Sequence, residues 1–469
     1  MLFNSLDFLL FFVFFFSIYL LLRHKWQNIL LIVASCLFYA FWNWKFLFLM
    51  FFSISTDFIC AKHMARCDRP RTRKALLFTS VGVNLAILGF FKYSNFFATN
   101  LIDALKVLGM ASPSAHWAIR VILPLGISFY TFEAISYVVD VYRRTVKPAA
   151  HYWDYVLFVI FFPHLIAGPI MRAKSFLPQV ATPRRISWEG FYEGCYYFFW
   201  GLFEKMFVAD NLARIVDPVF NGAQPARGAD ILLALYAFSF QIFCDFDGYS
   251  NMARGLGKMM GFDLAINFQW PYFSKNPREF WQRWHITLSS WLRDYIYIPL
   301  GGNRGSGLRI NINLMLTMLL GGLWHGANWT FVLWGFYHGC LIVAYRVFGQ
   351  SGQDQTRKSV QWIQAIVFFH CVAFGWLLFR AHDLAQAQGF VREMAFHMKA
   401  GPETFLTLQK FLLTAMPLLV VQMMQYRRND LLWAHRLPWI LKPLFFAALA
   451  YCILGWGVLR PETFIYFQF

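Results

Sequence analysis

The sequence predicts an all-α, polytopic integral membrane protein with about 11–12 transmembrane helices and additional re-entrant and interfacial helices. The first observation is composition, because 58% of the 469 residues are hydrophobic and only 14% are charged. Soluble domains are nearer half apolar and a quarter charged. The second is that aromatic residues reach 20%, and lipid solvates such a surface better than water does. The third is that apolar segments of spanning length recur along the whole chain.

The apolar segments begin close to the N-terminus. The candidate spans are 6–22, 27–42, 45–61, 75–91, 119–141, 190–209, 230–247, 329–347, 361–379, 405–425 and 439–459. The first span carries Asp7, follows no basic region and precedes Arg23 without a small-residue cleavage site. We therefore expect a retained span at this position and no cleaved signal peptide.

The formal net charge of +18 has two interpretations, nucleic-acid binding or membrane topology. Lys and Arg cluster in the loops 23–25, 62–74 and 143–147, between apolar segments, as they do in the cytoplasmic loops of multi-pass proteins. Alternation of the predicted spans places all three loops on one side. The sequence thus predicts a multi-pass protein surrounded by membrane lipid, with N- and C-termini on the outer side and no nucleic-acid partner. The bacterial cell inner membrane, with both termini periplasmic, is the location implied by the family resemblance described below.

Two apolar segments are too irregular for complete spans. Segment 152–171 contains two prolines and a glycine and is followed by four cations, which a full crossing would place outside. We expect it to be re-entrant. Segment 311–324 ends at Gly321–Gly322. We expect it to stop partway through the membrane and to form a broken hairpin with 329–347.

Cysteine and histidine spacing gives no sign of a metal site. The eight cysteines include no CxxC pair, and His285, His325 and His338 do not fit the HExxH spacing of zinc enzymes. We therefore assign no metal.

Two acids, Asp245 and Asp247, stand at the end of the span 230–247. Acidic side chains inside a membrane are costly, so a functional role is the default interpretation. The alternative is that both lie at the cytoplasmic interface and pair with Arg254 or Lys258. The sequence leaves both interpretations open.

Segment 276–295 has the periodicity of an interfacial helix. Bulky residues recur at three- and four-residue steps at Trp281, Trp284, Leu288, Trp291 and Tyr295. Asn276 before Pro277 predicts the start of this helix. His285 lies in it, and on its own a histidine of this kind is more often a packing residue than a catalyst.

The sequence around His325 indicates a catalytic role more strongly than the sequence around His285 does. His325 lies in the apolar run 319–329, whose four small residues permit close backbone approach. A broken helix at membrane depth is tolerated where it lines a cavity. Desolvation there favours a neutral imidazole that can accept a proton, as a general base for hydroxyl attack must. The alternative is a structural histidine bonded to a carbonyl group.

The glycine-rich loop 299–307 lacks the Gly-Lys-Ser/Thr ending of a nucleotide-binding loop, and no strand precedes it. With Asn303, Arg304 and the following Arg309, it offers amide and cationic groups to the phosphates of a coenzyme. A tight turn without a ligand is the equally weighted alternative.

Four motifs resemble the membrane-bound O-acyltransferase family, specifically its alginate O-acetyltransferase membrane-subunit branch. They are Cys244–Asp245–Phe246 with Gly248–Tyr249–Ser250, Trp284–Ser289, Tyr297–Arg304 and Gly322–Gly326. The resemblance covers nearly the whole chain. It implies one membrane domain over residues 1–469, with a catalytic core at about 230–350 and a C-terminal tail at 460–469. It also implies that His325 is the catalytic histidine and His285 a second functional polar residue.

The resemblance further implies an acetyltransferase. The donor substrate would be acetyl-CoA, with no tightly bound cofactor. Acetyl would cross the membrane to a periplasmic SGNH-hydrolase-like partner, which would acetylate an exopolysaccharide such as an alginate-like polymer or cellulose. Peptidoglycan or a lipid remains an alternative acceptor. A transporter or flippase for acyl or sugar precursors is the alternative from another class, but the chain shows no paired half-repeats.

The final residues, 464–469, form an aromatic motif that contains Tyr466. It resembles the C-terminal ending of a small partner protein in D-alanyl transfer to teichoic acids, where a tyrosine is proposed to carry the acyl group. By that resemblance Tyr466 would be a catalytic acyl relay. An aromatic belt at the membrane surface is the alternative.

Overall fold

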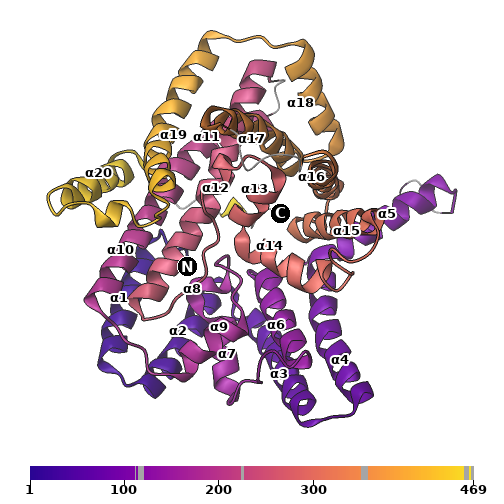
Figure 1. Cartoon of the computed structure of the whole chain (residues 1–469), viewed down its shortest axis with the longest axis vertical. Helices are drawn as coiled ribbons and strands as arrows, with labels where there is room; N and C mark the ends of the chain where they lie inside the picture. The colour runs from indigo at the N-terminus through magenta and orange to yellow at the C-terminus, as the bar shows by residue number, and fades with distance from the viewer. Residues whose placement is uncertain are drawn as a thin grey trace. The chain divides into compact units, whose positions relative to one another are not determined.

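The computed structural model describes residues 1–110, 112, 114, 121–222, 226–349, 357–458 and 464–465. These residues fold into helices joined by turns and short extended segments, and none of them forms a strand (Figure 1). The predicted all-α class is therefore confirmed. Contacts divide the chain into unit 1, Met1–Ile186 with Met260–Leu264, and unit 2, Ser187–Met259 with Ala265–Phe469. Nothing in this division tests the predicted single domain, which stays a prediction.

Seven helical stretches among the described residues are long and apolar enough to cross a membrane. They are His24–Asn43, Lys45–Arg66, Pro70–Val107, Gly228–Met259, Trp329–Phe348, Lys358–Arg380 and Pro402–Arg428. Leu6–Leu21 and Leu441–Trp456 are shorter apolar helices. A multi-pass membrane protein is confirmed, while the predicted number of about 11–12 spans stays a prediction.

Unit 1 contains the N-terminal helices. They are α1 (Leu6–Leu21), α2 (His24–Asn43), α3 (Lys45–Arg66), α4 (Pro70–Leu88), the π-helical turn η1 (Gly89–Tyr93), α5 (Ser94–Val107), α6 (Ile127–Tyr142), α7 (Tyr152–Ile160), α8 (Phe162–Leu165) and α9 (Ala173–Ala181). Helix α6 begins at Ile127, although the sequence predicted a span from 119. The start is set by Gly126, whose φ of 73° is left-handed and not helical.

A buried carboxylate joins three helices of unit 1. Asp57 of α3 accepts hydrogen bonds from Ser80 Oγ (2.5 Å) and Asn84 Nδ2 (2.8 Å) of α4. Its other oxygen accepts a bond from Tyr155 Oη of α7 at 3.4 Å. A buried charge is costly unless hydrogen bonds compensate it, so this acid has a structural explanation in the packing of α3 against α4 and α7.

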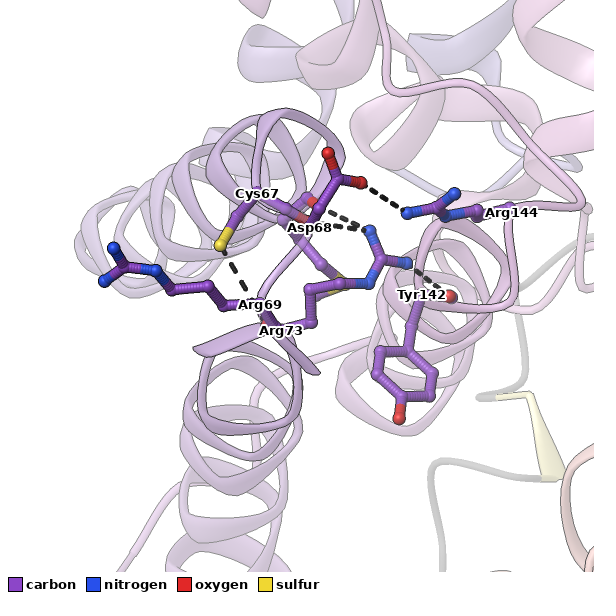
Figure 2. Close-up of polar contacts among 7 residues, drawn as sticks. Cys67, Asp68, Arg69, Arg73, Tyr142 and Arg144 are labelled. Atoms are coloured by element: carbon purple, nitrogen blue, oxygen red, sulfur yellow. Dashed lines mark hydrogen bonds and ion pairs between the residues drawn. The ribbon is translucent and has the colours of Figure 1, made fainter. Parts of the chain in front are cut away.

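One buried arginine, Arg73, lies in the first turn of α4, just after the loop that joins α3 to α4 (Figure 2). The Arg73 guanidinium donates to the carbonyl oxygens of Met64 (2.6 Å) and Cys67 (3.4 Å) at the end of α3, and to that of Tyr142 (2.6 Å) at the end of α6. It therefore satisfies carbonyl groups that helix ends leave unpaired. Arg144 forms an exposed ion pair with Asp68 at 2.8 Å in the same loop region.

The segment predicted to be re-entrant is broken. Helix α7 ends at Ile160, Phe161 is not helical, and α8 spans only four residues. The Glu133 carboxylate of α6 accepts the backbone N–H of Met171 at 2.7 Å and lies 3.4 Å from His164 Nε2. These contacts supply polar partners that a continuous helix would supply itself. The irregular backbone agrees with the prediction, while a re-entrant path stays a prediction.

Unit 2 contains the remaining helices. They are α10 (Trp188–Leu202), the π-helical turn η2 (Phe203–Ala209), α11 (Asp210–Phe220), α12 (Gly228–Met259), the 3₁₀ turn η3 (Pro271–Phe273), α13 (Pro277–Arg283), α14 (Ile286–Leu292), the π-helical turn η4 (Arg293–Tyr297), α15 (Gly307–His325), α16 (Trp329–Phe348), α17 (Lys358–Arg380), α18 (Leu384–Phe396), α19 (Pro402–Arg428), the 3₁₀ turn η6 (Ala434–Arg436) and α20 (Leu441–Trp456).

Glycines let α10 pack tightly against α12. A Cβ atom added to Gly194 of α10 would lie 2.7 Å from the Gly255 carbonyl oxygen of α12. One added to Gly248 of α12 would lie 2.8 Å from the Gly201 carbonyl oxygen of α10. Small residues at such positions permit the close backbone approach that stabilises membrane helix pairs. This packing fixes α12, which carries Asp245 and Asp247.

The segment predicted over 311–324 lies in α15, which ends at His325, and its stop partway through the membrane stays a prediction. Helix α15 continues through both glycines to His325, because Gly322 packs against Gly335 of α16 and needs no break. The predicted hairpin with α16 is present. Asn328 caps the start of α16, its side chain accepting the Thr330 N–H at 3.1 Å.

Candidate active site

His325 is the last residue of α15, at the turn of the hairpin. Its ring is buried, with 4% of the residue exposed, and aromatic side chains enclose it. The ring centroid lies 5.0 Å from that of Trp334 on α16 and 5.2 Å from that of Phe379 on α17. Three helices therefore position this histidine, and its site is largely apolar.

His285 lies between α13 and α14 with a left-handed φ of 40°. The expectation of one continuous helix over 276–295 is wrong at this residue. The break has a local cause, because Asn267 offers competing partners. Its carbonyl accepts the Ile286 N–H (2.8 Å), and its side-chain oxygen accepts the Thr287 hydroxyl (2.8 Å). The predicted start at Asn276 is confirmed, since its side chain accepts the Glu279 N–H at 2.9 Å.

Burial determines the protonation state of His285. The residue is completely buried, and burial lowers its pKa from 6.5 to about 3, because an apolar site disfavours the charged imidazolium. Its ring lies 4.5 Å from that of Phe246 on α12, in an edge-to-face arrangement. The ring is therefore neutral at physiological pH and able to exchange hydrogen bonds.

The two predicted histidines come together. Their ring centroids are 6.5 Å apart, although 40 positions separate them in the sequence. Trp324 lies beside both, at 4.9 Å from His325 and 5.9 Å from His285. Two buried imidazoles at this separation can act on one bound group, one ring accepting a proton and the other orienting a substrate atom.

Asp245 takes part in a buried ion-pair network. Its Oδ1 lies 2.6 Å from the Lys205 ammonium of η2, which also contacts Asp210 at 2.8 Å. The alternative that Asp245 pairs with Arg254 or Lys258 is therefore wrong. In the described part of the chain Asp247 forms no ion pair with Arg254, which donates to Asn251 and Tyr197, so for Asp247 the two interpretations stay open.

The Asp245 network continues to the C-terminal segment, the short yellow segment beside α12 in Figure 1. Asp245 Oδ2 accepts the Ile465 N–H at 2.6 Å. The Phe464 ring lies 5.8 Å from that of Phe246 and 5.4 Å from that of Tyr249. Since Phe246 also contacts His285, the segment packs against a residue of the histidine site. Tyr466 lies outside the described residues.

The glycine-rich loop forms a compact turn. Gly301, Gly302 and Gly305 have positive φ angles of 118°, 56° and 108°, which favour glycine. Asn303 Oδ1 accepts the Tyr297 hydroxyl at 2.6 Å. Arg309, at the start of α15, donates to the Leu300 carbonyl at 3.4 Å. Both therefore stabilise the turn, while Arg304 is exposed and able to meet an anionic ligand.

Lys205 is the site residue that sequence reasoning missed. It is 6% exposed and bridges two acids. The signal was present, because Lys205 lies within the predicted span 190–209, and an ionisable group inside a span indicates a functional or pairing role. The sequence alone did not show which residue pairs with Lys205, since Asp245 lies 40 positions further along the chain.

Comparison with known proteins gives consistent matches. The model of the membrane-bound O-acyltransferase family matches residues 36–381, a range that includes both histidines. The chain is 43% identical to the probable alginate O-acetylase of Pseudomonas aeruginosa, over 82% of this chain and 73% of the relative. It is 42% identical to the probable alginate O-acetylase of Azotobacter vinelandii, over 89% of this chain and 82% of the relative. It is also 35% identical to the peptidoglycan O-acetyltransferase of Helicobacter pylori, over 78% and 73%.

Proposed function

The chain belongs to the membrane-bound O-acyltransferase family, and from this premise we propose that it acetylates an exopolysaccharide through a transmembrane relay. The donor is acetyl-CoA on the cytoplasmic side of the bacterial inner membrane. A periplasmic SGNH-hydrolase-like partner receives the acetyl group and transfers it to the polymer. The names of the relatives support a polysaccharide acceptor, either alginate-like or a comparable polymer such as cellulose.

The buried pair of His325 and His285 is the observation that carries the proposal. His325 acts as the general base. Its neutral ring takes the proton of a hydroxyl group while that oxygen attacks the thioester carbonyl. A new ester bond forms and the carbon–sulfur bond breaks. Coenzyme A then leaves as the thiolate and takes up the proton from His325, which becomes neutral again. His285, whose ring centroid lies 6.5 Å from that of His325, binds or orients the substrate.

The donor site includes the turn 299–307. Cations and backbone amides suit the phosphates of coenzyme A. Asn303 and Arg309 hold the turn in shape, and Arg304 extends from it as an exposed cation. In this proposal Arg304 makes the direct phosphate contact, and the other two residues support it.

The C-terminal tail carries the acetyl group outward. Tyr466 accepts acetyl at its hydroxyl and passes it to the partner protein. A phenol with a solution pKa near 10 leaves more easily than an alkyl alcohol, so its ester stays reactive. The position of Phe464 and Ile465 beside α12 supports this route, because Phe246 contacts both Phe464 and His285.

One experiment distinguishes an acetyltransferase from a transporter or flippase. The purified chain is incubated with acetyl-CoA that carries a label on the acetyl group, and the products are a labelled acceptor and free coenzyme A thiol. The proposal expects release of thiol beyond one equivalent per chain to depend on a hydroxyl acceptor, because Tyr466 itself takes the first acetyl group. A transporter or flippase would move the labelled compound without breaking its thioester bond, and that result would contradict the proposal.

A further inference from the structure

A cavity of about 750 Å³ lies in unit 2, apart from the histidine site. It is bounded by η2 and α11, the start of α12, the first turns of α19 and the end of α20. Its lining includes Phe207, Arg214, Asp230, Glu403, Lys410, Leu413, Tyr451 and Trp456. The volume lies within the range of pockets that bind small molecules. The proposed acetyl transfer does not use this cavity.

The polarity of the lining changes along the cavity. Glu403 and Lys410 are seven positions apart on α19, about 10 Å along its axis, and Leu413 follows. The first turn of α19 is fixed at the acidic end, because the Thr404 hydroxyl donates to Asp230 at 2.6 Å. Along α19 the lining therefore passes from the acids Asp230 and Glu403 to the Lys410 cation and then to Leu413.

Helix α11, η2 and the end of α20 complete the lining. Arg214 of α11 lines the same cavity as Lys410, and Phe207 of η2 lies seven positions, about two helical turns, before Arg214. Trp456 of α20 is held against α11, because its carbonyl oxygen accepts the Asn211 side-chain amide at 2.9 Å. With Tyr451, these aromatic side chains add to the apolar part of the lining.

The two cations that line the cavity have no ion-pair partner among the residues that the structure describes. Neither Arg214 nor Lys410 forms an ion pair with a residue in the described part of the chain. Two cations beside an apolar surface in a membrane protein attract an anionic group such as a phosphate. Asp230 and Glu403, joined through Thr404, attract a cation in the same way.

We propose that this cavity binds one ethanolamine glycerophospholipid. The phosphate lies between Arg214 and Lys410, the primary ammonium contacts Asp230 and Glu403, and the acyl chains begin along Leu413 and the aromatic end. The two acids disfavour a head group with net negative charge. A quaternary ammonium head group fits less well, because it has no N–H to donate to the carboxylates.

Native mass spectrometry of the full-length chain in detergent tests this site. The protein is mixed with equal amounts of phosphatidylethanolamine, phosphatidylcholine and phosphatidylglycerol. We expect one phosphatidylethanolamine adduct to predominate. Charge reversal in the double variant Arg214→Glu/Lys410→Glu is expected to weaken it at least tenfold, about 1.4 kcal/mol. The matched control Arg392→Glu/Arg428→Glu changes two exposed cations outside the cavity and is expected to retain the adduct.

A second variant tests the cavity without changing its charge. Leu413→Trp fills the apolar end, and we expect loss of the adduct with no change in thermal unfolding or in elution from a size-exclusion column. Equal adducts of all three lipids would overturn the proposal. So would undiminished phosphatidylethanolamine binding in either cavity variant, or an equal loss in the control.

Discussion

Lys205 and Asp245 form a buried ion pair of 2.6 Å that joins η2 to α12. Asp210 shares the same ammonium at 2.8 Å. Because the second oxygen of Asp245 holds the Ile465 N–H, one ion pair connects the helical core of unit 2 to the C-terminal segment. The proposed acyl relay depends on the position of that segment.

Replacing Asp245 tests whether this residue positions the C-terminal segment without contributing to the binding of acetyl-CoA. Asp245→Ala removes the acceptor for Ile465 and one partner of Lys205, and loss of one partner of a buried pair costs about 3 kcal/mol. We expect kcat for acetyl transfer to fall strongly while KM for acetyl-CoA stays unchanged. Asp245→Asn keeps an acceptor oxygen and is expected to retain more activity than the alanine variant. Wild-type kcat in Asp245→Ala, measured by thiol release, would contradict this role.

His285 makes stability depend on pH. Its pKa is lowered to about 3 in the folded chain from 6.5, so the unfolded chain binds the extra proton between these values. The contribution of His285 to the free energy of unfolding is therefore fully present above pH 6.5. It decreases as pH falls towards 3, by up to about 1.4 kcal/mol per pH unit.

We expect His285→Asn to flatten this dependence between pH 6.5 and 4, measured by thermal unfolding in detergent. Asparagine is chosen because it tolerates the left-handed φ at this position. If the slopes of the variant and the wild type coincide, His285 does not titrate on unfolding.

Arg304 tests the donor site. Arg304→Glu places a negative charge where phosphate is proposed to bind, and we expect affinity for coenzyme A to fall about tenfold, roughly 1.4 kcal/mol. Arg304→Lys keeps the charge and should lose less. Lys358→Glu, an exposed cation at the start of α17, serves as the control. Titration calorimetry measures all three, and unchanged affinity in Arg304→Glu would leave the tight turn as the better explanation.

Tyr466→Phe tests the relay. The substitution keeps the apolar contacts of the tail and removes only the hydroxyl. We expect acetylation of the polymer to be lost in cells, and acetyl from the labelled donor to be absent from the C-terminal peptide. Full polymer acetylation by this variant would show that the tail only anchors or docks the partner.

Much of the fold follows from local sequence. Apolar length predicts the helices, and Asn276 before Pro277 marks a helix start, because these signals act within a few residues. The features that local sequence does not predict depend on a distant element. Asn267 breaks the helix at His285, and Gly335 allows α15 to continue through Gly322. Neither partner can be identified from the periodicity of the segment itself.

The candidate site also combines features that local sequence indicates with features that depend on tertiary packing. His325 was identifiable because an ionisable residue among small and apolar neighbours is costly unless it has a role. The approach of His285 to His325 could not be derived from periodicity, since it depends on how α13 and α14 pack against α15. Lys205 was visible as a charge within a span, but its pairing with Asp245 requires the tertiary structure.

The most direct test of the central claim is acetyl transfer by His325→Ala and His325→Gln. Purified variants receive labelled acetyl-CoA and a hydroxyl acceptor, and coenzyme A binding is measured in the same preparations. General-base catalysis contributes about 10²–10⁴-fold, so we predict a loss of acceptor-dependent thiol release of that size, with coenzyme A affinity and thermal unfolding unchanged. Wild-type rates in either variant would contradict the assignment of His325 as the base.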